Sequence, residues 1–275
     1  MRIYLALLLA LLAGGCSTAR VLYENADIYL KWKVSSYLAL DDADAGELDS
    51  RIEDFVAWHR THALPQYAAI GDEAARRLSR GLSREDLVWG YDSAIAQARE
   101  SARAAAEKIA PLLDRLTPAQ IAHLERELAD DNRRFARQYL RGGEPERRRR
   151  RVERNVERLE DWVGGLSKAQ IERVALYSER APLLEELRAR DRRRLQAELL
   201  AIVRAREAQK RLPEAAAHWD AGRDPAYAAA YEASRREYFA MLLDLDRSLS
   251  EGQRARALRV AKRWAEDFRS LARSR

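Results

Sequence analysis

The segments LTPAQI at residues 116–121 and LSKAQI at residues 166–171 carry the same signal for the start of an α-helix. In each, a Thr or Ser can accept a hydrogen bond from a free backbone N–H, and the Gln three residues later can bond back to the capping residue. The flanking Leu and Ile can pack as a hydrophobic staple. LSREDL at 82–87 shares both features, whereas LSEGQR at 249–254 has Arg254 in the staple position. Four helices are therefore predicted to begin at these caps.

Composition extends the helical prediction to the rest of the chain. Of 275 residues, 34% are charged, and only 12 are Gly and 7 are Pro. Ala, Leu, Glu and Arg are abundant, and all four favour helices. Short breaks between helices make sequential helices antiparallel neighbours. The sequence therefore predicts an all-α fold, an antiparallel helical bundle or a curved stack of helical hairpins, with about nine to ten helices.

Gly and Pro residues indicate where the helices end. Breaks are expected at Gly142-Gly143, Gly164-Gly165, Ala181-Pro182, Leu212-Pro213 and Gly222. The expected helices cover approximately residues 19–42, 45–62, 65–80, 84–114, 118–140, 144–163, 168–180, 182–211, 225–245 and 251–271.

The first 17 residues, MRIYLALLLALLAGGCS, decide where the chain is expected to reside. One Arg precedes an unbroken apolar run, and small residues follow it, which is typical of a secretory signal peptide. The run is too short to cross a bilayer, because a spanning helix needs roughly 20 apolar residues. Residues 1–15 are therefore expected to be removed, residues 16–18 to form the new N-terminus, and residues 19–275 to form the helical body. A subdivision near residue 142 is left open.

Leu12-Ala13-Gly14-Gly15-Cys16 resembles the lipobox of bacterial lipoproteins. The resemblance implies cleavage before Cys16 and acylation of this residue, which is the only cysteine in the chain. Ser17, rather than Asp, after the cysteine implies an outer-membrane protein that faces the periplasm. The alternative is a soluble secreted protein whose single cysteine lies near the cleavage site.

Aromatic residues recur on the first expected helix. Within residues 19–42, apolar and aromatic positions follow one another mostly at spacings of three and four and include Tyr29, Trp32 and Tyr37. One interpretation is a stripe that packs on the body. The other is an interfacial role near lipid headgroups, where Tyr and Trp are favoured.

Arginine is concentrated at residues 147–151 and again between residues 188 and 194. Glu residues at helical spacing can pair with these arginines, which favours a solvated, salt-bridged surface. The alternative is contact with an anionic partner such as lipid headgroups or acidic protein segments. The net charge of +6 is too small to argue for nucleic acid, and the signal peptide argues against it. The candidate binding surface comprises Arg147, Arg148, Arg151 and Arg154, together with Trp58, His59 and Tyr67.

The sequence contains little that indicates catalysis. It has no Gly-rich phosphate loop, no Gly-x-Ser-x-Gly motif and no metalloprotease motif. His59 and His62 lie three residues apart, but a metal site needs three or four ligands, and this segment supplies no third. We therefore expect neither a catalytic residue, a metal nor a cofactor.

Two resemblances to known families can be stated. Tyr23-Glu24-Asn25-Ala26-Asp27, Trp58-His59-Arg60, Leu64-Pro65-Gln66-Tyr67 and Trp162-Val163-Gly164-Gly165-Leu166 resemble a family of proteobacterial lipoproteins that is defined by a domain of unknown function. That resemblance implies no activity. The repeated Leu-Thr/Ser-x-x-Gln segments are similar to the motif of small periplasmic stress chaperones of the Spy and CpxP type, which implies binding of unfolded proteins.

These observations favour a non-enzymatic, chaperone-like binding protein of the envelope. Its expected partners are the membrane, through Cys16, and unfolded or envelope proteins. The alternative is a structural or assembly lipoprotein that docks on one defined envelope partner. An enzyme with an unrecognised site is the third hypothesis.

The lipid anchor gives the first testable prediction. Cells fed with labelled palmitate should label the wild-type protein and leave Cys16→Ser unlabelled, because no other cysteine can replace Cys16. Label that persists in Cys16→Ser would place the anchor elsewhere.

Overall fold

The computed structural model describes residues 23–274, which are helical and contain no strand. The all-α prediction is therefore confirmed. Cys16 and residues 1–15 lie outside the described residues. The elements are α3 (Ala26–Leu38), α4 (Asp42–Trp58), the π-helical segment η1 (His59–Ala63), α5 (Leu64–Ser79), α6 (Arg84–Leu113), α7 (Pro118–Tyr139), α8 (Glu144–Val163), α9 (Lys168–Arg180), α10 (Glu185–Arg204), α11 (Ala208–Ala217), α12 (Pro225–Ser248) and α13 (Glu251–Arg273).

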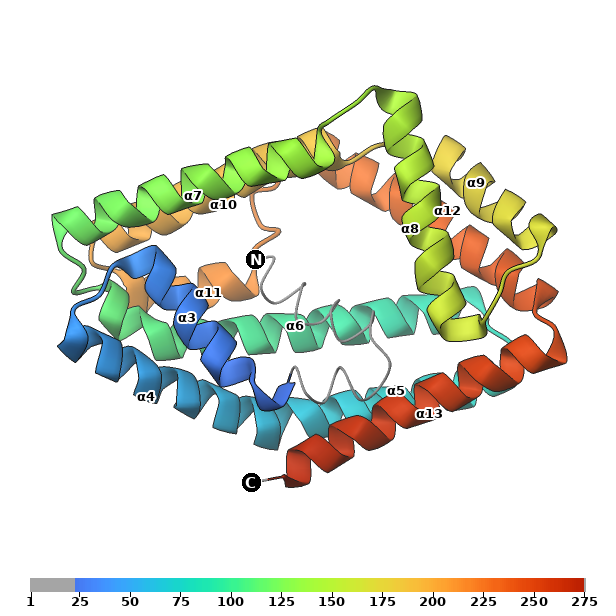
Figure 1. Cartoon of the computed structure of the whole chain (residues 1–275), viewed down its shortest axis with the longest axis horizontal. Helices are drawn as coiled ribbons and strands as arrows, with labels where there is room; N and C mark the ends of the chain where they lie inside the picture. The colour runs from blue at the N-terminus through green and yellow to red at the C-terminus, as the bar shows by residue number, and fades with distance from the viewer. Residues whose placement is uncertain (1–22, 275) are drawn as a thin grey trace.

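The helices pack mainly in pairs that follow one another around the molecule (Figure 1). Helix α5 lies along α13, α6 along α11, and α7 along α10, while α9 packs against both α8 and α12. The buried apolar residues form several separate clusters. The all-α helical bundle is confirmed, but the expectation that sequential helices are neighbours fails for α5 with α13, α6 with α11 and α7 with α10, which join helices far apart in the chain.

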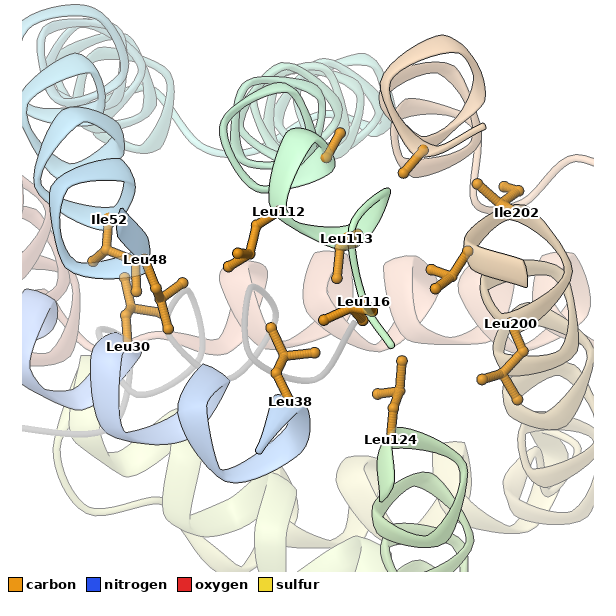
Figure 2. Packing of buried hydrophobic residues seen from close by; sticks show 13 residues of the cluster. Leu30, Leu38, Leu48, Ile52, Leu112, Leu113, Leu116, Leu124, Leu200 and Ile202 are labelled. Carbon is orange, nitrogen blue, oxygen red and sulfur yellow. The ribbon is translucent and has the colours of Figure 1, made fainter. Parts of the chain in front are cut away.

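The largest cluster joins six helices, α3, α4, α6, α7, α10 and α11 (Figure 2). Leu48 of α4 and Leu112 of α6 are fully buried, and Leu116 is 1% exposed. Removal of such side chains from water stabilises the fold by roughly 1.5–3 kcal/mol each. The cluster comprises Leu30, Leu38, Leu48, Ile52, Ala110, Leu112, Leu113, Leu116, Leu124, Leu200, Ile202, Val203 and Ala208.

All four predicted capping boxes are confirmed. Ser83, Thr117, Ser167 and Ser250 each accept a hydrogen bond from the backbone N–H three residues later, and the side chain of that later residue accepts one from the cap. Arg254, which replaces the staple residue of the last box, has another use. It donates to the carbonyl oxygen of Leu78 at 3.0 Å and to the Asp246 carboxylate at 2.9 Å, and so joins α13 to α5 and α12.

Two of these boxes are also joined to each other. The side-chain amides of Gln170 and Gln253 donate to each other's Oε1, both at 3.0 Å. Gln170 also donates to the carbonyl oxygen of Ser248 at 3.1 Å, and Gln253 donates to that of Gly165 at 2.9 Å. Gln170 is buried. The starts of α9 and α13 therefore share one hydrogen-bond network.

The predicted helix over residues 182–211 is wrong at its C-terminal end, as is the break at Leu212-Pro213. Helix α10 ends at Arg204, and Pro213 lies inside α11. The carboxylate of Asp114 accepts hydrogen bonds from the backbone N–H groups of Ala208 at 2.6 Å and Gln209 at 3.1 Å. This cap comes from a residue about a hundred positions away along the chain, so local sequence patterns could not reveal it.

The expected break between residues 62 and 65 is a continuous helical path in the structure. Helices α4 and α5 are joined through η1, in which the N–H of Leu64 bonds the carbonyl oxygen of His59. Pro65 has no N–H to donate, and its ring disfavours ordinary α geometry in the turn before it. The wider π turn accommodates the proline without ending the helix.

The aromatic stripe of α3 does not pack wholly on the body, as the first interpretation expects. Leu30 and Leu38 are buried, and Tyr37 is half-buried, but Tyr29 is 47% exposed and Trp32 is 64% exposed. Within residues 23–274, no helix combines the length and the apolarity that crossing a bilayer requires.

The paired Gln residues give the second prediction. Gln170→Ala should lower the free energy of unfolding by about 1–3 kcal/mol, because it leaves buried polar partners without hydrogen bonds. Gln120→Ala is the matched control, because Gln120 holds the equivalent capping position and is less buried. Denaturant melts of both variants, of Gln253→Ala and of the Gln170→Ala/Gln253→Ala double variant should show a coupling of about 0.5–3 kcal/mol. Additive effects of the two Gln substitutions would contradict a shared network.

Candidate functional site

A pocket of about 300 Å³ lies between α6, α7, α10, α11 and α12. Its walls are mainly apolar and include Ile95 of α6, Leu195 and Leu199 of α10, Leu212 of α11, and Trp219, which follows α11. Pockets that bind small ligands or side chains are typically about 300–1,000 Å³ and mainly apolar, with a few polar groups that fix orientation. The pocket falls at the small end of this range.

The pocket exists because small alanine side chains line the contact between two of its helices. Ala98 and Ala102 of α6 and Ala215 and Ala216 of α11 line it where these two helices lie side by side. An Ala side chain ends at Cβ, so it fills little of the space between two helices. The Asp114 carboxylate, by capping the start of α11, holds this wall in position against α6.

One side of the pocket carries an ordered group of charges around Asp191. Asp191 is 5% exposed and accepts a hydrogen bond from Nε of Arg194 at 2.9 Å. Nε of Arg223 lies 3.8 Å from the other carboxylate oxygen. The guanidinium of Arg223 also stacks 4.8 Å from the ring centre of Tyr227. Arg194 donates to the carbonyl oxygen of Trp219 at 2.8 Å, so the charge cluster also fixes the turn after α11.

Arginines outnumber carboxylates in the lining of the pocket. Arg188, Arg192 and Arg223 line the pocket, as do Asp191 and Glu198. Both carboxylates lie beside Arg194, with Glu198 at 3.5 Å. Arg188 is exposed and makes no ion pair with a carboxylate of residues 23–274. Such a pocket suits an apolar group that lies next to a negative charge.

Aromatic rings complete the lining. Arg192 lies 5.1 Å from the ring centre of Phe135, and Arg223 lies 5.3 Å from that of Tyr231. Burial raises the pKa of the Tyr227 hydroxyl, against the opposing effect of Arg188 and Arg223. The hydroxyl is therefore neutral at physiological pH and acts as a polar contact rather than an ionised group. Among the described residues, no cluster of three or more His, Cys, Asp or Glu side chains could hold a metal ion.

The sequence-predicted arginines lie on α8, and two of them are used inside the protein. Arg148 donates to the carbonyl oxygens of Ser178, Glu179 and Ala181, at 2.9 Å for Glu179 and 3.0 Å for Ala181. Arg151 is 8% exposed and donates to the carbonyl oxygens of Ser178, Ala181 and Pro182 at 3.0–3.1 Å. Both side chains therefore satisfy the free carbonyl groups at the end of α9. Burial lowers the pKa of Arg151.

The other two predicted arginines differ from this pair. Arg147 forms an ion pair with Glu186 at 3.1 Å, and its side chain is 15% exposed. Arg154 is exposed. Of the predicted arginine set, Arg154 is therefore the one whose side chain is directed mainly to solvent.

Trp58, His59 and Tyr67 meet at the π-helical segment. The Tyr23 hydroxyl lies 3.0 Å from Nδ1 of His59, and the Tyr67 hydroxyl lies 3.3 Å from Nε2. Trp58 lies in the same cluster and stacks on His62 with a ring-centre distance of 5.5 Å. Burial lowers the pKa of His59 to about 4, so the imidazole is neutral at pH 7. His59 thus bridges two tyrosines, and these residues pack in a different cluster from the arginines of α8.

A family of unknown function (DUF6279) matches residues 36–219 of the chain. The match covers more than half of the 275 residues. This chain belongs to that family. No curated protein and no solved structure matches the chain.

Membership in DUF6279 confirms the expectation of a family of unknown function. The lipid anchor and the likeness to stress chaperones stay predictions. The matched segment contains α6, α10, α11 and Trp219 of the pocket, whereas Tyr227 and Tyr231 follow it.

The sequence shows the concentration of arginines between residues 188 and 194, but it does not predict the pocket that Arg188 and Arg192 line. Its apolar lining consists of Ala, Leu and Ile at helical spacing, which looks like any packed helix face. The available signal was the aromatic group of Trp219, Tyr227 and Tyr231 around the break at Gly222. Arg223 lies among these aromatic residues in the sequence, and arginine stacks favourably on aromatic rings.

The contrast between the buried Arg151 and the exposed Arg154 of α8 gives the third prediction. Arg151→Ala should lower the free energy of unfolding by about 1–3 kcal/mol, because the Pro182 carbonyl group loses its bond from Arg151 while those of Ser178 and Ala181 keep Arg148. Arg154→Ala, one turn further along α8, should change it by no more than roughly 0.5 kcal/mol. Urea melts of the two variants measure the difference. Equal, small effects would mean that Arg151 does not hold the end of α9.

Proposed function

We propose that this chain is a non-enzymatic binding protein, anchored through Cys16 to the outer membrane and facing the periplasm. It holds apolar side chains of other envelope proteins in the pocket between α6, α10, α11 and α12. The observation that carries the proposal is the combination of mainly apolar walls with Arg188, Arg192 and Arg223 at one pocket. The preferred partner segment has a large apolar residue next to Asp or Glu.

The contacts of the pocket support this choice of partner. An apolar side chain that leaves water for the space around Leu199 and Trp219 gains roughly 25 cal/mol per Å² of buried apolar surface. An adjacent carboxylate can pair with Arg188, which is exposed and has no ion pair within residues 23–274. Arg guanidinium and carboxylate groups form short, bidentate hydrogen bonds.

The size of the pocket also favours a second function, docking on one defined envelope partner. A cavity of about 300 Å³ has room for one or two large side chains rather than for a long unfolded segment. A chaperone-like protein would use it on many clients, and a docking protein on one. The site is the same in both cases.

An aggregation assay on unrelated unfolded clients gives the fourth prediction. The wild-type protein should slow client aggregation, and Ala98→Phe should abolish this protection, because the Phe side chain fills the pocket. Ala94→Phe is the matched control, since Ala94 is exposed one turn earlier on α6 and does not line the pocket. Arg188→Glu should weaken client binding about tenfold, which corresponds to about 1.4 kcal/mol.

Arg190→Glu is the control for charge, because Arg190 is exposed on the same helix and does not line the pocket. Thermal melts of all four variants check folding. Protection that survives in Ala98→Phe would exclude the pocket as the client site. A wild-type protein that protects no client would exclude the chaperone-like function and favour docking on one partner.

A further inference from the structure

Within residues 23–274, most of the large apolar side chains that are exposed lie on α3. Ile28 is 62% exposed, Tyr29 47% and Trp32 64%. The other large apolar side chains that are exposed within residues 23–274 are Val88 at 36% and Ile171 at 37%. Single exposed apolar residues are common on protein surfaces, but a contiguous group of them indicates a contact site.

The three side chains share one face of the helix. Ile28 and Trp32 lie four residues apart, and Tyr29 and Trp32 three apart, so they are neighbours on the helix surface. The ring centres of Tyr29 and Trp32 are 6.0 Å apart. We use the name α3 platform for Ile28, Tyr29 and Trp32.

The body holds the α3 platform in a fixed orientation. Leu30, on the opposite side of the helix, is buried in the main apolar cluster. Nζ of Lys31 donates to the Glu53 carboxylate of α4 at 2.7 Å, and the Tyr37 hydroxyl donates to Asp131 of α7. In Figure 1, α3 crosses between α4 and α7 on the side nearest the viewer. The platform therefore cannot turn inward without breaking these contacts.

The chain length between Cys16 and the body limits the distance of the α3 platform from the lipid. Tyr23 is 5% exposed and bonds His59, so the chain joins the body at a fixed point beside η1. Tyr23 lies seven positions after Cys16, and seven steps of about 3.3–3.6 Å reach at most about 25 Å. Ile28 follows Tyr23 by five residues, so the platform lies close to the junction.

The chemistry of the α3 platform suits the interfacial region of a bilayer. Trp and Tyr are enriched there because one part of each ring system is apolar and another part is polar. Nζ of Lys33 lies 4.5 Å from the ring centre of Tyr37 and 6.0 Å from that of Trp32, so it fixes the position of these rings rather than forming part of the exposed surface. A tether this short also keeps the effective concentration of the surface at the membrane high.

We infer that the α3 platform is a membrane-contact surface that rests in the headgroup region of the bilayer. The inference rests on the proposed lipid anchor at Cys16. The anchor determines that the protein is at the membrane, and the platform determines which face of the helical body lies against it.

A spin label placed beside the two aromatic residues tests this inference. The lipidated full-length protein carrying Ile28→Cys is incorporated into vesicles of phosphatidylethanolamine and phosphatidylglycerol. With Cys16 acylated, position 28 is the single free thiol, because the chain has one native cysteine. The substitution keeps Tyr29 and Trp32. Ile171→Cys on α9 is the matched control, since it also replaces an exposed Ile.

The nitroxide at position 28 should be more accessible to membrane-soluble oxygen than to an aqueous nickel chelate, and the nitroxide at position 171 should show the reverse. When Tyr29→Ser and Trp32→Ser are added to Ile28→Cys, the label should become more accessible to the nickel chelate than to oxygen. The melting temperature should stay unchanged. A label at position 28 that is as aqueous as the control, or shielded from both reagents, would overturn the inference. Vesicle flotation separates the lipid anchor from the membrane contact of the α3 platform. If the protein floats with the vesicles but the label at position 28 is exposed to water, only the membrane contact is contradicted. A protein that does not float contradicts the anchor, and the inference fails with it.

Discussion

The free carbonyl groups at helix ends are the constraint on which this structure depends. Each α-helix leaves its last four carbonyl groups without a partner inside the helix, and a chain with so many helices has many such groups. Here arginines from neighbouring helices donate to them. Arg148 and Arg151 serve the end of α9, Arg194 the end of α11, and Arg254 the ends of α5 and α12.

Arginine therefore has a second use in this chain, beside the ion pairs that it forms with Asp and Glu. A guanidinium group presents several N–H donors in a plane, so one side chain can satisfy two or three carbonyl groups at once. A positive charge at a helix C-terminus also interacts favourably with the helix dipole. Outside the main apolar cluster, the other clusters are small, and the described residues form no disulfide. The bonds of arginine to helix ends therefore matter most among α5, α8, α9, α12 and α13, which contribute no buried residue to the main cluster.

The sequence predicts those parts of the fold that depend on residues close together in the chain. The four capping boxes are of this kind, because Thr117 and Gln120 lie within one turn of each other. The cap that Asp114 provides to Ala208 depends on tertiary packing, as do the contacts of Arg151 with α9. For the same reason the pocket was not predicted: the alanines of α6 and α11 form its walls only once the two helices are side by side.

The contacts around η1 bring the two ends of the described chain together. Tyr23 bonds His59, the neighbouring Arg60 donates to the carbonyl oxygen of Ser274 at 3.2 Å, and Leu271 packs in the same cluster. A pull on the chain before Tyr23 is therefore applied to a point where the first and last segments are both held. The bond between Tyr23 and His59 carries such a pull before it reaches α3, which begins at Ala26. A substitution at His59 or Arg60 therefore acts on the first and the last described segments at once.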